Sequence, residues 1–135
     1  MNSTRTLKLL SIAATIAALS AFPGRSFAET AKLDGSVYAG KLWMQGEKKP
    51  EADTFIFKDG TFRSTACDKY GFTAVAYRAM QDGDATLIEA ETQSPSDGRM
   101  VWRGTVRAGQ FEGVNTWHPK RGSATEGWFR AEIRK

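Results

Sequence analysis

The strongest constraint on the fold is a period-two alternation of apolar and polar residues, which recurs from residue 36 to residue 134 and is interrupted by turn-forming residues. Alternation of this kind puts every second side chain on one face of a β-strand. The turn signals recur about every ten positions, a spacing typical of small all-β domains. No segment of this region has the period of an amphipathic helix. The pattern therefore predicts an all-β protein.

The first two hairpins are recognised from their turn residues. Asp59-Gly60 fits a two-residue type I′ turn, because both positions accept a positive φ, and this register pairs Phe57 with Phe62. The second turn is either Asp82-Gly83 or Gly83-Asp84. Both choices leave the same side chains on one face, namely Val75, Tyr77, Ala79, Ile88 and Ala90.

A turn at Ala108-Gly109 closes the third hairpin. It places Trp102 opposite Asn115 and Gly104 opposite Gly113. Two facing glycines among large aromatic residues predict a sharp bend of the sheet or an aromatic ring packed over the backbone. Both features are useful where a sheet closes on itself.

Two further strands, over residues 36–44 and 125–134, flank the three hairpins and bring the expected count to eight. Consecutive strands are expected to lie side by side in an antiparallel, up-and-down sheet. Small sheets of this kind tend to close, because closure removes both exposed edges. We therefore expect a single closed β-barrel domain, with a β-sandwich as the alternative.

Residues 1–28 have the layout of a cleaved secretory signal peptide, which leaves residues 29–135 as the folded domain. Basic residues precede an uncharged run over residues 9–22, and small residues stand at the −3 and −1 positions of a cleavage site after Ala28. The uncharged run is short for a membrane span. We expect a periplasmic or secreted protein that is not inserted in the membrane.

Most of the excess of basic over acidic residues comes from that leader. The sequence has a formal net charge of +4, with 19 Lys and Arg residues against 15 Asp and Glu residues. The leader holds Arg5, Lys8 and Arg25 and no acidic residue, so residues 29–135 are nearly neutral. A nearly neutral domain gives no electrostatic reason to bind nucleic acid, and no such partner is expected.

The connections differ in length between the two ends of the predicted barrel. The three tight turns fall at one end. The long connections fall at the other end and cover residues 45–51, 67–72, 93–98 and 118–124. Loops around the mouth of a barrel are a preferred place for a ligand site. This geometry would gather the only cysteine, Cys67, and the only histidine, His118, at one rim.

The candidate ligand-binding residues are aromatic and polar residues near this rim: Tyr70, Trp102, Asn115, Trp117 and His118. Trp102, Trp117 and Tyr77 would line an apolar cavity or would only fill the core, since an eight-stranded barrel is just wide enough for side chains to fill it. Asn115 faces inward, and a buried Asn needs hydrogen-bond partners. It therefore belongs to a structural hydrogen bond or to a ligand contact.

Cys67 excludes an intramolecular disulfide, because the chain has no second cysteine. The simplest interpretation is a cysteine at the end of a strand, and Cys67→Ser is then expected to leave the fold stable. The alternatives are a reactive thiol, or a Cys67–His118 pair that acts with Asp68 in nucleophilic catalysis or holds a metal. No nucleophile motif and no closely spaced pair of metal ligands supports the catalytic or metal alternative. No cofactor is predicted.

Two segments resemble a group of short, uncharacterised proteins exported by bacteria: FKDGTFRSTACDKYGF, residues 57–72, and MVWRGTVR, residues 100–107. This resemblance does not indicate what the activity is. The predicted architecture is also similar to the calycin-type barrels, the lipocalins and avidins, and that likeness implies a ligand in the mouth of the barrel and no catalysis. Gly40 and Trp43 stand one residue too far apart for the early G-x-W motif of the lipocalins. No site residue is therefore carried over.

The sequence thus favours a periplasmic, non-enzymatic barrel that binds a small apolar or amphipathic molecule at its rim. One alternative is an envelope interaction or stress-related protein with a solid core, whose outer face contacts another protein. The other is the Cys/His-dependent enzyme or metal site. A pocket at the rim separates the first hypothesis from the second.

Overall fold

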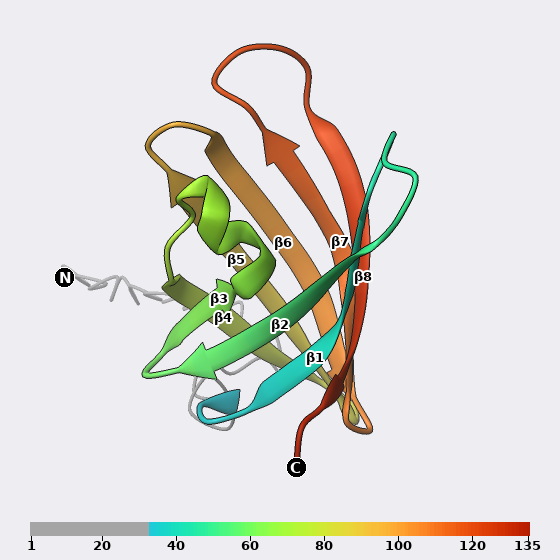
Figure 1. Ribbon diagram of the computed structural model, residues 1–135. Helices are drawn as coiled ribbons and strands as arrows, with labels where there is room; N and C mark the ends of the chain where they lie inside the picture. The colour runs from blue at the N-terminus through green and yellow to red at the C-terminus, as the bar shows by residue number, and fades with distance from the viewer. Residues whose placement is uncertain (1–32) are drawn as a thin grey trace, which may run out of the picture.

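Each alternating segment forms a strand, and the strands close into an antiparallel barrel in chain order (Figure 1). The computed structural model describes residues 33–135, so the predicted leader lies outside the described residues. The strands are β1 (Val37–Met44), β2 (Glu51–Lys58), β3 (Thr61–Ser64), β4 (Val75–Asp82), β5 (Ala85–Ser94), β6 (Gly98–Arg107), β7 (Gln110–His118) and β8 (Thr125–Ile133). Pairing of β1 with β8 closes the sheet, which confirms the predicted barrel over the sandwich.

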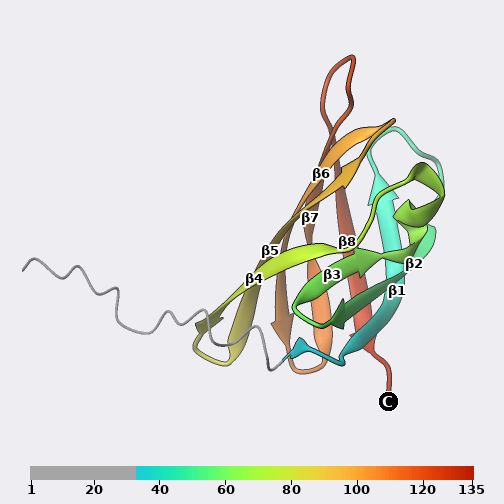
Figure 2. The same cartoon turned by 90° about the vertical axis from the view of Figure 1, so that its left-hand side faces the viewer.

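The turn residues set the hairpin registers as predicted. Asp59 and Gly60, between β2 and β3, have φ values of 52° and 74°. Asp82 pairs with Ala85, so the second turn is Gly83-Asp84. The predicted inward residues of β4 and β5 share one face. The tight turns lie at one end of the barrel and the longer connections lie at the other (Figures 1 and 2).

The facing glycines of β6 and β7 lie where rings and backbone approach each other closely. Gly104 pairs with Gly113 in the sheet. A Cβ atom at Gly104 would lie 2.5 Å from Cε2 of Phe111, and one at Gly113 would lie 2.0 Å from the carbonyl oxygen of Arg103. The ring over the backbone that the sequence predicted is therefore present at Gly104, and neither position has room for a side chain.

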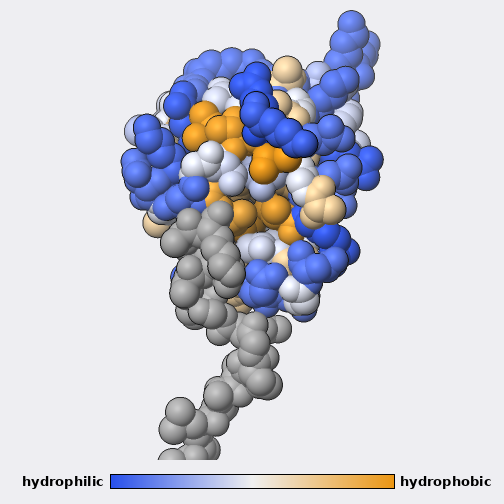
Figure 3. All heavy atoms as spheres, turned by 90° about the horizontal axis from the view of Figure 1, so that it is seen from below, coloured by the Kyte–Doolittle hydropathy of each residue, from blue (hydrophilic) through white to orange (hydrophobic). Residues whose placement is uncertain are grey.

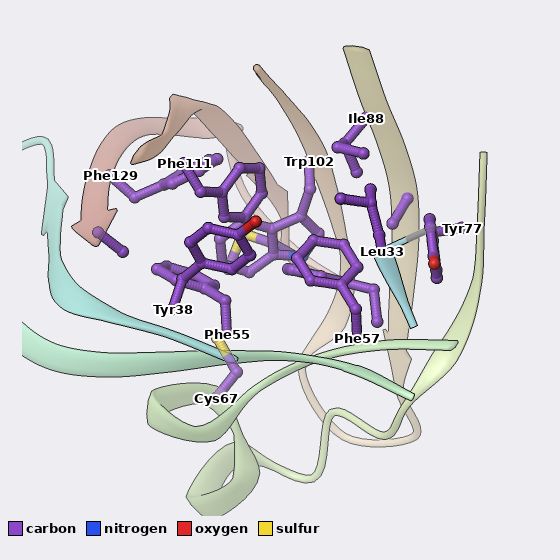
Figure 4. Packing of buried hydrophobic residues seen from close by; sticks show 14 of the residues in the cluster. Leu33, Tyr38, Phe55, Phe57, Cys67, Tyr77, Ile88, Trp102, Phe111 and Phe129 are labelled. Atoms are coloured by element: carbon purple, nitrogen blue, oxygen red, sulfur yellow. The ribbon is translucent and has the colours of Figure 1, made fainter. Parts of the chain in front are cut away.

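Aromatic side chains fill the barrel below the rim (Figure 4). Phe111 is fully buried, and its ring centroid lies 4.7 Å from that of Phe129 and 5.4 Å from that of Phe55. Trp102 belongs to the same cluster, and its Nε1 donates a hydrogen bond to Thr92 Oγ1 at 3.0 Å. Seen from the end with the tight turns, hydrophobic residues are visible in the middle and hydrophilic residues surround them (Figure 3). Aromatic rings from several strands therefore fill the middle of the barrel.

A 3-10 helix, η2 (Thr65–Tyr70), follows β3 and lies at the end with the longer connections (Figures 1 and 2). The long connection predicted over residues 67–72 is therefore present between β3 and β4, but it begins earlier and contains a helix that the sequence did not predict. β3 pairs with β4 through only two residue pairs, so the chain leaves the sheet early. The helix ends at Gly71, whose φ of 84° is in the left-handed region. The β5–β6 connection is shorter than predicted and covers residues 95–97.

Candidate functional site

A pocket of about 330 Å³ opens at the end of the barrel that carries η2, and we call it the rim pocket. It is lined by Leu42, Met44, Glu47, Glu51, Ala66, Cys67, Tyr70, Phe72, Asp97, Met100 and Trp117. These residues come from η2, from β1, β2, β6 and β7, and from the adjoining connections. Small-molecule sites have volumes of roughly 300–1,000 Å³ and mainly apolar walls. The rim pocket fits the lower end of that range.

Strands supply the walls of the pocket because their inward-facing positions continue beyond the aromatic core. On β6, Met100 is the next inward residue after Trp102 toward the rim. Met100 pairs with Trp117 of β7, which is also inward-facing. On β1, Leu42 and Met44 occupy the equivalent alternating positions. These side chains therefore border the pocket on one side and the buried rings on the other.

Asp53 of β2 holds the start of η2. This residue is 3% exposed, and its carboxylate accepts hydrogen bonds from Ser64 Oγ at 2.5 Å and from the backbone N–H of Ala66 at 3.0 Å. Ser64 is the N-cap of η2 but makes no side-chain cap bond of its own. Asp53 therefore caps the N-terminus of η2 from a neighbouring strand. Burial raises the pKa of Asp53 above its usual value, although its hydrogen bonds act in the opposite direction.

The other end of η2 is tied to the β5–β6 connection. Ser94 Oγ donates a hydrogen bond to the carbonyl oxygen of Tyr70 at 2.6 Å and accepts one from the backbone N–H of Asp97 at 3.1 Å. Two exposed ion pairs lie along the helix, Arg63 with Asp68 and Glu51 with Lys69. Exposed pairs contribute little to stability. The hydrogen bonds of Asp53 and Ser94 therefore fix the helix beside the pocket.

Trp117 joins the pocket wall to the same connection. Its indole Nε1 donates a hydrogen bond to the carbonyl oxygen of Asp97 at 2.7 Å. Its ring is partly buried and packs against the core cluster. The bond satisfies the only polar atom of the indole, so the ring presents an apolar surface to the pocket.

Asn115 lies beneath the methionines of the pocket. It is 1% exposed, and its Nδ2 lies 3.2 Å from the Sδ atoms of both Met44 and Met100. Among residues 33–135, its Oδ1 has no hydrogen-bond partner. A buried polar atom without a partner costs about 1–3 kcal/mol. A structural hydrogen bond therefore accounts for only one end of this amide.

Cys67 is part of the core, which corrects the expectation of a cysteine at a strand end. The residue is 4% exposed and points from η2 into the aromatic cluster (Figure 4). Burial raises the pKa of its thiol to about 12, and the charges of Asp53 and Glu51 act in the same direction. Because the thiolate is the nucleophile, this environment disfavours thiol chemistry at neutral pH.

The predicted ligand-binding residues are only partly brought together. Tyr70 and Trp117 line the rim pocket, and Asn115 lies just below it. Trp102 is 1% exposed and belongs to the core, because it stands one inward position further from the rim than Met100. His118 is not a lining residue, since it follows Trp117 on β7 and so faces the opposite side of the sheet. Cys67 therefore has no histidine beside it in the pocket.

Several lining residues were missed by the sequence reasoning: Leu42, Met44, Phe72, Met100, Glu47, Glu51 and Asp97. A partial signal existed for Met44 and Met100, which occupy inward positions near the rim ends of their strands. The acidic residues lie in or beside connections, where no periodic pattern indicates direction.

No protein-family model, curated protein or solved structure matches this chain. Among residues 33–135, no group of three or more His, Cys, Asp or Glu side chains is arranged to hold a metal ion. Within the same part of the chain, no helix is both long and apolar enough to cross a membrane. The interpretation of the site therefore depends on the geometry of the rim pocket.

Proposed function

We propose that this protein is an exported, non-enzymatic β-barrel that binds a small apolar or amphipathic molecule in the rim pocket. The observation that carries the proposal is an apolar pocket of about 330 Å³ at the rim of a barrel whose interior is otherwise filled by aromatic rings. Hollows of similar volume lie over outward-facing residues of the strands, but their walls are less apolar than those of the rim pocket.

The way η2 is held also supports binding. The hydrogen bonds of Asp53 and Ser94 fix the helix without a ligand. A ligand would therefore not have to order this segment, and less of its binding free energy would be lost to conformational entropy. Covering the apolar walls of the pocket would contribute about 25 cal/mol for each Å² removed from water.

Export is supported by the leader-like pattern of residues 1–28. Binding at the mouth is also what the likeness to calycin-type barrels implies. The Cys/His-dependent enzyme receives less support, because the thiol of Cys67 is buried and His118 does not line the pocket.

A suitable probe is tert-butylbenzene, which is neutral, apolar and compact. Titration followed by NMR should shift the backbone amide signals of Ala66 and Cys67 and the indole N–H signal of Trp117. Signals around Val114, on the outer wall, should not move. If no signal moves up to the solubility limit of the probe, or if shifts occur only on the outer wall, the proposal is wrong.

A pocket-filling variant gives an independent test. Ala66→Phe adds a ring to a residue that lines the pocket, so the affinity for tert-butylbenzene should fall at least tenfold, or by about 1.4 kcal/mol. Val114→Phe adds the same ring at an exposed position and serves as the matched control. Equal affinities of the two variants would place the probe elsewhere. The NMR titration of the unmodified protein covers the case in which Ala66→Phe does not fold.

A further inference from the structure

Resting on the proposed function, we propose that the rim pocket selects a cation with a hydrocarbon body, and specifically a quaternary ammonium compound. The ionisable groups, the aromatic rings and the mainly hydrocarbon walls of the pocket together favour such a ligand.

The charged side chains that line the pocket are acidic. Among residues 33–135, the ionisable lining residues other than Cys67 and Tyr70 are Glu47, Glu51 and Asp97, and no Lys, Arg or His lines the pocket. Glu51 is paired with Lys69. Within residues 33–135, the carboxylates of Glu47 and Asp97 make no hydrogen bond or ion pair. Two acidic groups at this pocket are thus available to a ligand, and they favour a cation.

Aromatic rings add a second, independent attraction. Tyr70, Phe72 and Trp117 line the pocket together. A cation near the face of an aromatic ring is attracted by its quadrupole, and rings grouped around a site are the usual means of recognising quaternary ammonium ions. Lys69 Nζ already lies 5.1 Å from the centroid of the Tyr70 ring, so one face of this ring holds a cation of the protein, and Phe72 and Trp117 are the rings left for a ligand.

The composition of the walls favours a quaternary over a primary ammonium ion: apart from the three carboxylates and the hydroxyl of Tyr70, the described side chains that line the pocket carry no strong hydrogen-bond acceptor. The walls are mainly hydrocarbon and sulfur, from Leu42, Met44, Cys67 and Met100. The Oδ1 atom of Asn115 is a buried acceptor, but it does not line the pocket. A primary ammonium group carries three donors that would lose water without full replacement. A quaternary group has no N–H and presents methyl groups to such walls.

The test compares two probes of nearly the same shape. Phenyltrimethylammonium differs from tert-butylbenzene by a positively charged nitrogen in place of one carbon. By NMR titration at low salt, the cation should bind at least about tenfold more tightly than the neutral isostere, as expected for combined cation–π and ionic attraction. The advantage should shrink as salt is added, because Glu47 is exposed and its charge is screened.

Charge-neutral variants locate the source of the preference. In Glu47→Gln/Asp97→Asn, the ratio of the two affinities should fall toward one. The matched control is Asp84→Asn/Glu132→Gln, which removes the same two charges at the turn end of the barrel and should keep the ratio of the unmodified protein. If tert-butylbenzene binds at the rim and the cation binds no more tightly, the selectivity is wrong while the proposed function stands. If neither probe binds, both fail.

Discussion

Asp53 is the residue whose replacement tests the candidate site most directly, because one buried carboxylate holds η2 beside the pocket. In Asp53→Ala, Ser64 Oγ and the N–H of Ala66 lose the acceptor that they contact at 2.5 Å and 3.0 Å. Ser64 is only 3% exposed, so water cannot readily replace the lost partner. Asp53→Asn keeps the size of the side chain and one carbonyl oxygen, and it is the matched control.

The magnitude follows from the orphaned donors, which are Ser64 Oγ, the N–H of Ala66 and, more distant at 3.4 Å, Thr65 Oγ1. A buried polar group that loses its partner costs about 1–3 kcal/mol. Part of the loss is offset, because the alanine variant no longer buries a carboxylate. We expect Asp53→Ala to lower the free energy of unfolding by about 2–4 kcal/mol. Asp53→Asn should remain within about 1 kcal/mol of the unmodified protein at neutral pH.

The pH dependence gives a second, signed test. Burial raises the pKa of Asp53 in the folded protein, so the folded state holds this proton more tightly than the unfolded state does. The resulting stabilisation is fully present below the unfolded pKa of about 3.9, and it is lost as the pH rises through the raised folded value. Asn does not titrate. Asp53→Asn should therefore gain stability relative to the unmodified protein between pH 4 and pH 7.

Urea unfolding followed by tryptophan fluorescence measures both effects. Two results would refute the reasoning. One is an alanine variant within about 0.5 kcal/mol of the unmodified protein, which would be typical of a surface substitution. The other is a stability difference between Asp53→Asn and the unmodified protein that changes with pH in the opposite direction, which would mean that the hydrogen bonds outweigh burial.

Three further predictions concern other parts of the barrel. Because burial raises the pKa of Cys67 to about 12, iodoacetamide at pH 8 should alkylate the unfolded protein far faster than the folded one, and equal rates would show an accessible thiolate. Since the thiol belongs to the core, Cys67→Ser should lower the free energy of unfolding in urea by about 1–2 kcal/mol. An unchanged free energy of unfolding would instead agree with the prediction from the sequence that this substitution leaves the fold stable. Gly113→Ala should lower the free energy of unfolding by about 3 kcal/mol or more, because its Cβ would meet a backbone oxygen. Val114→Ala, on the outer wall, is the control. Equal stabilities of the two variants would contradict the close approach at Gly113.

The sequence was sufficient for the barrel because the decisive signals are local. The Asp59-Gly60 turn fixes a register by its own dihedral preferences, and Gly104 and Gly113 mark the closely packed strands by residue type alone. The helix η2 could not be predicted in this way. Its N-cap, Ser64, makes no side-chain cap bond, and the carboxylate that takes its place comes from Asp53 on another strand. A capping signal of this kind exists only in the folded structure.

The same limit applies to the candidate site. Connection lengths placed the long loops at one end, and they correctly indicated where a pocket would be sought. The alternation also showed that Trp102, Met100 and Trp117 face inward. It could not show at which inward position the aromatic core ends and the pocket begins, because that boundary depends on rings contributed by distant strands. Trp102 falls on the core side of the boundary, and Met100 falls on the pocket side.

Asp53 connects the stability of the barrel with the shape of the pocket. β3 pairs with β4 through only two residue pairs, and the chain then continues as η2, which borders the pocket instead of extending the wall. A buried carboxylate is a costly way to hold a helix, and such costs are expected where position matters for function. Asp53→Ala should therefore lose affinity for tert-butylbenzene as well as stability. Asp34→Ala is the comparison, because Asp34 accepts hydrogen bonds from Gly60 N–H at 2.9 Å and Tyr77 Oη at 2.8 Å at the turn end. It should lose stability while the folded protein keeps its affinity, and equal losses of affinity in both variants would show that η2 does not shape the site.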